Sequence, residues 1–235
     1  MKQLKRVVLL TVLMFVVSMG ASISLKAAIG VGAWDAMGQS VSYLTGVKVG
    51  TIGMIFNSLC VLGQILILRK NFKWIQLLQL PVNILLGTLI NFFLYEVLVS
   101  LTIDNYVVNL LLLMGALVLM SLVVSAVMVL NVVTFALEGF CMAIAQVTKI
   151  KFSKIRQGMD ILSVLIVLTL TFGFSLPLSL REGTILGMLL FAPLMGFFMG
   201  KLQPIFKRLD LLEEEPIAEI KSEQEEQWKV TDLDC

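Results

Sequence analysis

Six long apolar segments dominate this chain and constrain its fold more than any other feature. A membrane-spanning helix needs about 20 mostly apolar residues, and six stretches come close to or exceed that length. They lie at residues 7–24, 51–68, 74–99, 106–128, 155–172 and 183–199. Of the 235 residues, 58% are hydrophobic and only 14% are charged, which is too few polar groups to cover a water-soluble domain. The segments therefore predict an all-α integral membrane protein with six transmembrane helices.

Positive charges are distributed unevenly around these segments. When six spans are threaded in order, one side of the membrane holds 15 of the 18 Lys and Arg residues, and the other side holds Lys26, Lys48 and Arg181. Loops rich in Lys and Arg stay in the cytoplasm. We therefore expect the N- and C-termini both to be cytoplasmic.

The last part of the chain, residues 209–235, has a different composition. It carries 10 of the 16 acidic residues and only 2 of the 18 basic ones. Such an acidic, polar segment is typical of a disordered tail. We therefore divide the chain into a membrane domain, residues 1–208, and an acidic cytoplasmic tail, residues 209–235, which either keeps the protein solvated or docks a partner.

The membrane domain contains an internal repeat at an offset of 103 residues. Several polar positions coincide at this offset: Ser18 with Ser121, Ser22 with Ser125, Asp35 with Glu138 and Asn57 with Asp160. Residues 87–90 align with 192–195 at an offset of 105. Repeat one covers about 1–103 and repeat two about 104–208, with three spans in each, so the second must enter the membrane from the opposite side. The repeat also argues that the first apolar segment is retained, although a basic start and an apolar run also describe a signal peptide.

Each half contains a short segment between its first and second spans that is too apolar for a solvated loop. In the first half this is residues 28–50, where we expect a re-entrant or interfacial half-helix over 36–44, with Asp35 as its cap and Gly46 at its end. Its counterpart lies at about 137–147. Broken backbone at membrane depth is tolerated only where protein or a water-filled cavity surrounds it. Two such elements in matching positions indicate a ligand site between the halves.

Four acidic residues lie away from the predicted outer loops and the tail, and one of them, Glu96, can reach the interface from the outer end of its span. The other three are Asp35, Glu138 and Asp160. A charge inside a membrane costs about 2.5–3.5 kcal/mol on insertion scales, so each is a candidate for a functional site. Together with Asn57, which the repeat aligns with Asp160, they form our predicted central site for a cation, a proton or a polar substrate. The structural alternative is that Asp35 and Glu138 only cap the half-helices, and that Asp160 pairs with Arg156 one helical turn earlier.

Two further residues near the first half-helix belong to the candidate set. Lys26 lies near the outer end of the first span, where it reaches the interface, pairs with Asp35 or binds an anion. Trp34 either anchors the chain at the membrane interface or stacks on a ligand.

Enzyme chemistry finds little support in this sequence. There is no histidine, the usual general base and the commonest transition-metal ligand. The three cysteines form no CxxC pair, and no Walker loop or dinucleotide fingerprint is present. We therefore predict no enzyme activity, no metal site, no cofactor and no nucleic-acid partner.

The stretch from Gly30 to Asn57, GVGAWDAMGQSVSYLTGVKVGTIGMIFN, resembles the YczE/YyaS/YitT group of bacterial multi-pass membrane proteins. The group has a G-x-x-x-W-D element, here within GVGAWD at 30–35, and a Leu-Thr-Gly-hydrophobic-x-x-Gly-Thr element, here LTGVKVGT at 44–51. In the second half the glycines are lost and the acid is kept as Glu138. The resemblance implies a bacterial inner-membrane protein of transporter-like character without an established substrate.

These observations predict a small-solute permease whose two halves rock around the central site. Two alternatives are a substrate-binding subunit of a multi-component importer and a non-transporting scaffold for a cytoplasmic complex. The partners we expect are the lipid bilayer, a small polar or ionic substrate, and either a second copy of the chain in a homo-oligomer or a cytoplasmic protein bound to the acidic tail.

Overall fold

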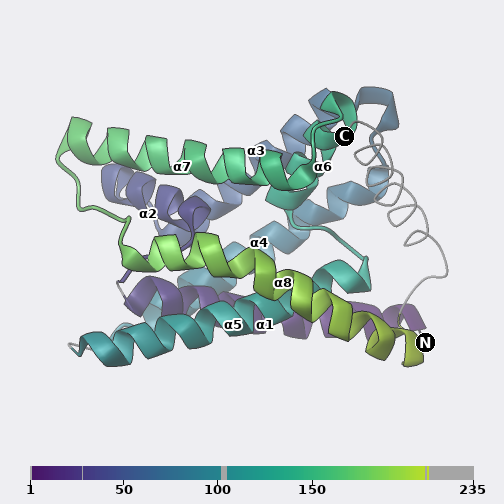
Figure 1. Cartoon of the computed structure of the whole chain (residues 1–235), viewed down its shortest axis with the longest axis horizontal. Coiled ribbons are helices and arrows are strands. Elements are labelled where there is room, and N and C mark those ends of the chain that lie inside the picture. Colours follow the sequence, from purple (N-terminus) through teal and green to yellow (C-terminus); the bar gives the residue numbers. More distant parts are fainter. Residues whose placement is uncertain (1, 28, 102–104, 210, 212–235) are drawn as a thin grey trace, which may run out of the picture.

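The computed structural model describes residues 2–27, 29–101, 105–209 and 211, and all regular elements within these ranges are helical (Figure 1). The first half consists of α1 (Lys2–Ala27), α2 (Ala33–Thr45), α3 (Val49–Leu68) and α4 (Gln79–Phe92). Two 3-10 helices, Arg69–Asn71 and Trp74–Leu78, precede α4, and a π-helical turn, Phe93–Val97, follows it. The second half consists of α5 (Tyr106–Leu130), α6 (Ala136–Thr148), α7 (Phe152–Phe174) and α8 (Glu182–Arg208).

Six of the helices in the described ranges are long and apolar enough to cross a membrane, which confirms the expected membrane fold. They are α1, α3, α4 with its flanking turns, α5, α7 and α8. The main difference from prediction is at α8, which continues to Arg208 instead of ending near residue 199. The basic residues Lys201, Lys207 and Arg208 therefore extend the last span as a polar helical end. Most of the acidic tail, residues 210 and 212–235, lies outside the described residues.

The second half reproduces the helix boundaries of the first at the offset found in the sequence. Three boundaries recur 103 residues later: the starts of α2 and α6 at Ala33 and Ala136, their ends at Thr45 and Thr148, and the starts of α3 and α7 at Val49 and Phe152. The residue that ends each short helix is left-handed in both halves, with φ of 73° at Gly46 and 61° at Lys149. Local backbone conformation thus repeats even where the residue type does not.

The long helices α1 and α5 lie side by side along the lower edge of the bundle in Figure 1. They run antiparallel, because Arg6 near the start of α1 donates a hydrogen bond of 2.9 Å to the carbonyl of Leu130 at the end of α5. The short helices cross between the halves, so that α2 packs mainly on α7 and α6 mainly on α3. Each half therefore supplies the long helix against which the short helix of the other half rests.

Matching serine hydrogen bonds join the first and last helices of each half. The Ser22 hydroxyl donates to the carbonyl of Ile90 at 3.3 Å, and the Ser125 hydroxyl donates to the carbonyl of Met195 at 3.0 Å. The serines differ by 103 positions and the acceptors by 105, as in the sequence alignment. The two halves thus use the same contact between α1 and α4 and between α5 and α8.

The halves differ in how their last two spans pack. In the first half, α3 lies directly on α4, and a Cβ on Gly50 would collide with the backbone oxygen of Gly87. The Asn91 side chain fastens this contact by accepting a hydrogen bond from the Gly50 amide (2.9 Å) and donating one to the Thr51 hydroxyl (3.0 Å). In the second half, α8 packs along α5 and stands apart from α7 (Figure 1).

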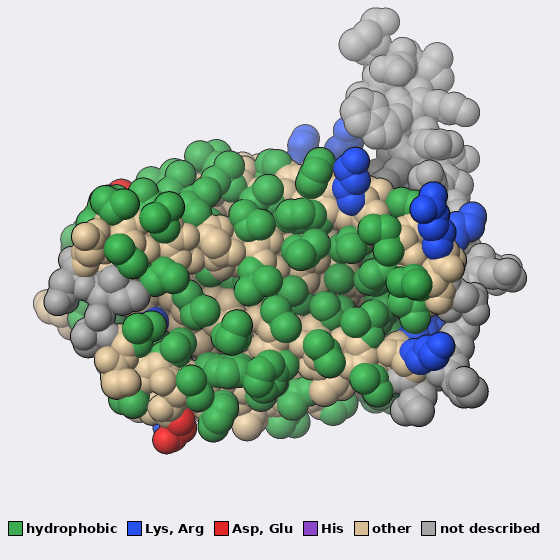
Figure 2. Space-filling model, turned by 90° about the horizontal axis from the view of Figure 1, so that it is seen from below, with side chains coloured by type: hydrophobic (Ala, Val, Ile, Leu, Met, Phe, Trp, Pro, Cys, Tyr) green, Lys and Arg blue, Asp and Glu red, His purple; other side chains and the backbone are tan. Residues whose placement is uncertain are grey.

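The surface of the bundle is apolar along its flank and basic at one end. Figure 2 shows a face covered by hydrophobic side chains, with most of the visible Lys and Arg at the end where the chain begins. Large apolar side chains such as Leu66, Phe172 and Leu189 are each at least 65% exposed. Such a surface is stable when lipid tails cover it.

Candidate functional site

Both short helices begin in the interior of the bundle and carry an acidic residue in their first turn (Figure 1). The helix α2 starts at Ala33, three residues before the predicted start, so Asp35 lies inside the helix and not at its cap. The capping residues are Gly32 and Phe135, and neither helix has a side-chain capping hydrogen bond. The prediction that Asp35 and Glu138 act as caps is therefore wrong, whereas Gly46 does end α2 as expected.

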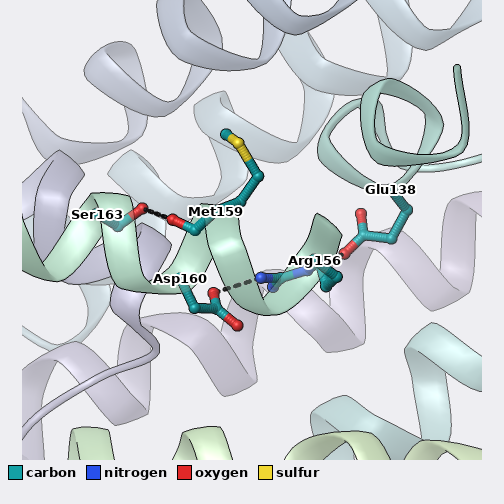
Figure 3. A network of polar contacts seen from close by, with 5 residues as sticks. All are labelled: Glu138, Arg156, Met159, Asp160 and Ser163. Carbon is teal, nitrogen blue, oxygen red and sulfur yellow. Dashed lines mark hydrogen bonds and ion pairs between the residues drawn. The ribbon is translucent and has the colours of Figure 1, made fainter. Parts of the chain in front are cut away.

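The acid of the second half belongs to an ion-pair network centred on Arg156 of α7 (Figure 3). The Nε atom of Arg156 lies 3.6 Å from Oε1 of Glu138, and its Nη1 atom donates to Oδ1 of Asp160. The three side chains are only 12–24% exposed. The pair within α7 was expected from the sequence, but its extension to α6 was not. Arg156 thus joins the start of α6 to the second and third turns of α7.

The acid of the first half faces a small cavity instead. The cavity has a volume of about 70 Å³, and its polar lining consists of Asp35 from α2, Asn57 from α3 and Asn83 from α4. Gly53 leaves the space in which the cavity forms, because nothing lies within 4 Å of a Cβ built there. A cavity of this size holds a few water molecules or a small ion.

Aromatic side chains form one wall of this cavity. The rings of Trp34 and Phe56 meet edge to face with centroids 5.9 Å apart, and both residues line the cavity. Trp34 packs against two of the buried apolar clusters of the bundle. The structure thus places Trp34 beside the cavity, packed against the apolar interior of the bundle.

The charges of the two halves act on one another. Arg156, Glu138 and Asp160 are the charged groups that exert an electrostatic effect on the Asp35 carboxylate. Two of the acids predicted from the sequence, Glu138 and Asp160, therefore pair with one arginine, and the third, Asp35, lies within electrostatic range of this cluster. Asn57 joins them through the cavity that Asp35 lines.

Lys26 lies apart from this group. It occupies the last turn of α1, and its Nζ atom donates a hydrogen bond of 3.2 Å to the carbonyl of Val99, beyond the end of α4. In the described part of the chain, no ion pair joins it to Asp35. Lys26 thus fastens the end of one span to the end of another.

Sequence reasoning did not give two of the central residues their roles. Arg156 was considered only as a partner for Asp160, although the repeat aligns it with Gly53, which marks where the two halves differ. Asn83 was not singled out, although an amide in an apolar span is itself a signal. The start of α6 is held by a pair of amides that was also not singled out. Gln64 donates a hydrogen bond of 2.9 Å to Gln79 and one of 3.1 Å to the carbonyl of Ala136.

The donor groups of the site are oxygen and nitrogen atoms of acids, amides and one guanidinium. Within the described ranges, no three or more His, Cys, Asp or Glu side chains come together closely enough to hold a metal ion. Cys60 and Cys141 are buried free thiols in an apolar cluster with Val61 and Leu137. The arrangement therefore suits binding of polar or charged solutes more than covalent chemistry.

Comparison with known proteins gives one match. A family model described as a family of unknown function, DUF6198, matches residues 4–200, which includes both halves of the bundle and ends before the acidic tail. No curated protein and no solved structure matches the chain. The resemblance to the YczE/YyaS/YitT group thus rests on the motifs between Gly30 and Asn57.

Proposed function

For this chain, which belongs to the DUF6198 family of unknown function, we propose the role of a small-solute permease. One observation carries the proposal: two half-helices begin inside the bundle, and in their first turns Asp35 lines a cavity and Glu138 pairs with Arg156. In transporters built from inverted repeats, discontinuous helices of this kind form the substrate and ion sites near the midplane. Charged groups at that depth are costly, so a binding role explains their presence.

The packing between the halves supports a mechanism of alternating access. Because α2 rests on α7 and α6 rests on α3, a rotation of one half against the other moves each short helix along the long helix of the other half. The ion pairs of Arg156 with Glu138 and Asp160 lie within the second half, so they would keep α6 and α7 together during this rotation. Transport then consists of exchanging the α2–α7 and α3–α6 contacts for an equivalent set that opens the site to the opposite side. Energy would come from an ion gradient or from a partner, since the sequence has no Walker loop.

Charge distribution supports an orientation with both ends of the membrane domain in the cytoplasm. The basic end in Figure 2 contains the start of α1, and the basic residues Lys149, Lys151 and Lys154 lie at the junction of α6 and α7. Under the positive-inside rule this end faces the cytoplasm of a bacterial cell. The acidic tail would then be cytoplasmic as well, where a docking role remains a separate proposal.

The decisive experiment measures from which side of the membrane the cavity is reached. In a variant whose three cysteines are replaced by alanine, Gly53→Cys places one thiol in the cavity, where a Cβ has open space. A membrane-impermeant maleimide is applied to intact cells and to inside-out vesicles. We expect labelling from both sides, because a permease exposes its site alternately. Labelling from one side only, or from neither, would overturn the proposal and favour a scaffold or a single-sided binding subunit.

A matched control is Gly115→Cys in the same background. Gly115 is an exposed residue of α5 and also has open space around a Cβ, but it does not line the cavity. Facing lipid, it should react poorly from either side. A thermal-shift screen of ions, amino acids, sugars and vitamins, with Asp35→Asn and Glu138→Gln alongside, then identifies the solute, because a ligand stabilises the state it binds.

A further inference from the structure

The cavity in the first half has an unusual polar lining. Asp35, Asn57 and Asn83 come from three different helices and converge on it. Within the described part of the chain, none of the three side chains makes a hydrogen bond or an ion pair with protein. Asn83 is only 2% exposed, and its Nδ2 atom is buried without a hydrogen-bond partner.

Such an arrangement is costly unless a ligand completes it. A buried polar group without a partner costs about 1–3 kcal/mol, and this cost applies to the Asn83 amide, whereas Asp35 and Asn57 are partly exposed. The buried amides of Gln64 and Gln79, by contrast, are hydrogen-bonded to each other. An unpartnered buried amide that lines the same cavity as a carboxylate and a second amide therefore points to a bound species.

The charge of the site identifies the kind of ligand. Its donors are one carboxylate and two neutral amides, which together supply oxygen atoms with a single negative charge. The amide of Asn83 can turn its Oδ1 atom into the cavity without breaking a hydrogen bond, because it makes none. Oxygen donors of this kind suit hard cations and exclude soft metals, which prefer thiolate or imidazole.

The charges in and around the cavity further indicate which cations it can bind. Arg156 acts on Asp35 electrostatically but forms its ion pairs with Glu138 and Asp160. The charge of Arg156 is offset by these two acids, so the charge balance inside the cavity depends on Asp35 alone. One carboxylate neutralises a monovalent cation, whereas a divalent cation would leave an excess positive charge in a largely apolar interior. A volume of about 70 Å³ accommodates one small ion with one or two waters, but no large organic solute.

We propose that Asp35, Asn57 and Asn83 bind one monovalent cation, an alkali-metal ion or ammonium, in this cavity. Asp35 supplies the charge, and the two amides supply neutral oxygen ligands. The part that this cation plays in transport, as coupling ion or as substrate, rests on the proposed permease function, whereas the binding itself does not.

The test measures the thermal stability of the purified full-length protein in detergent as a function of cation. NaCl, KCl and NH₄Cl are each titrated at constant ionic strength against N-methyl-D-glucamine chloride, whose cation is too large for the cavity. We expect a saturable rise in unfolding temperature of roughly 3 °C for at least one small cation. The response should disappear in Asp35→Asn and weaken at least tenfold in apparent affinity in Asn83→Leu.

The control variant is Glu96→Gln, which removes one negative charge from an exposed residue of the π-helical turn Phe93–Val97. It should keep the saturable response, because Glu96 does not line the cavity. Direct binding of ²²Na⁺ to the unaltered protein, with unlabelled K⁺ and NH₄⁺ as competitors, gives the same answer without any variant. Equal stability in all salts together with no ²²Na⁺ binding would overturn the inference, as would a full response in Asp35→Asn.

The two proposals fail separately. If Gly53→Cys is labelled from one side only while the cation response persists, the permease function is wrong and the cation site stands. If labelling alternates while no cation binds, the cation site is wrong and the permease function stands.

Discussion

The two halves of this protein share one backbone plan but distribute their charge and their packing differently. In the first half, α3 and α4 are closely packed, and the polar centre is a cavity with an unpaired carboxylate. In the second half, α7 and α8 stand apart, and the polar centre is filled by Arg156 with its two acidic partners. At the position where the first half has Gly53, the second half has Arg156. This difference in residue type explains why one half has a cavity and the other an ion-pair network. The same backbone plan thus provides a polar cavity in one half and an ion-pair network in the other.

The largest effect should follow from breaking the close packing that only the first half has. Gly50→Leu forces a side chain against the backbone of Gly87, so the α3–α4 contact has to separate. We expect a loss of about 3 kcal/mol in the free energy of unfolding, measured by denaturant unfolding in detergent. Gly196→Leu in α8, where a Cβ meets nothing within 4 Å, is the control and should change stability little. Equal losses in both variants would show that the halves do not differ in this way.

The next largest effect should come from breaking the ion-pair network centred on Arg156 in the second half. Arg156→Met leaves Glu138 and Asp160 without a cation. Breaking a fully buried pair costs about 3–5 kcal/mol, and because these side chains remain partly exposed we expect roughly 2 kcal/mol. The triple variant Arg156→Met, Glu138→Gln, Asp160→Asn removes all three charges and should recover most of that loss in the same unfolding assay. A triple variant less stable than the single one would contradict this account.

A smaller effect on stability is expected when an arginine like that of the second half is introduced into the first half. Gly53→Arg introduces an arginine beside Asp35, at the position that matches Arg156. The new ion pair offsets the cost of filling the cavity, so the free energy of unfolding should change by less than about 1 kcal/mol, while the stabilisation by monovalent cations disappears. Gly53→Met, similar in reach but uncharged, should be less stable than Gly53→Arg. If Gly53→Arg keeps its response to cations, the arginine does not replace the bound ion.

The smallest effects on stability are expected from removing the serine hydrogen bonds that the two halves share. Ser22→Ala and Ser125→Ala each remove one hydrogen bond between helices. Such bonds are worth about 0.6 kcal/mol in membrane proteins, and we expect similar losses from both in thermal unfolding. Ser163→Ala is the control, because its hydroxyl bonds to Met159 within its own helix. A loss confined to one of the two serines would mean that the matching contacts are not equivalent.

Much of the fold could be predicted from the sequence because it depends on local properties. Apolar length locates the spans, and Gly46 ends α2 because a left-handed residue is needed there. The aligned serines, and Asp35 with Glu138, revealed the repeat because polar residues are rare in such a chain. The separation of α7 from α8 could not be predicted, since it depends on which neighbour α8 packs against.

The site was predicted only in part, for a related reason. Asp35, Glu138 and Asp160 are conspicuous because charges are expensive in a membrane. Their roles were harder to foresee, because a capping acid and a cavity-lining acid look alike until the first residue of α2 is known. Asn83 carries no charge and resembles any amide that joins two helices, so only its lack of a partner in the fold reveals its importance.

The exchange of short helices between the halves also dictates the order in which the protein can assemble. With 13 residues, α2 is about 20 Å long and cannot cross the bilayer by itself. The helix it rests on, α7, begins at Phe152, more than 100 residues later in synthesis. Until α7 has entered the membrane, α2 can pack only on α3 of its own half, and its main contact is missing. Completion of the first half therefore waits for the second, and the central site forms only as the last helices insert.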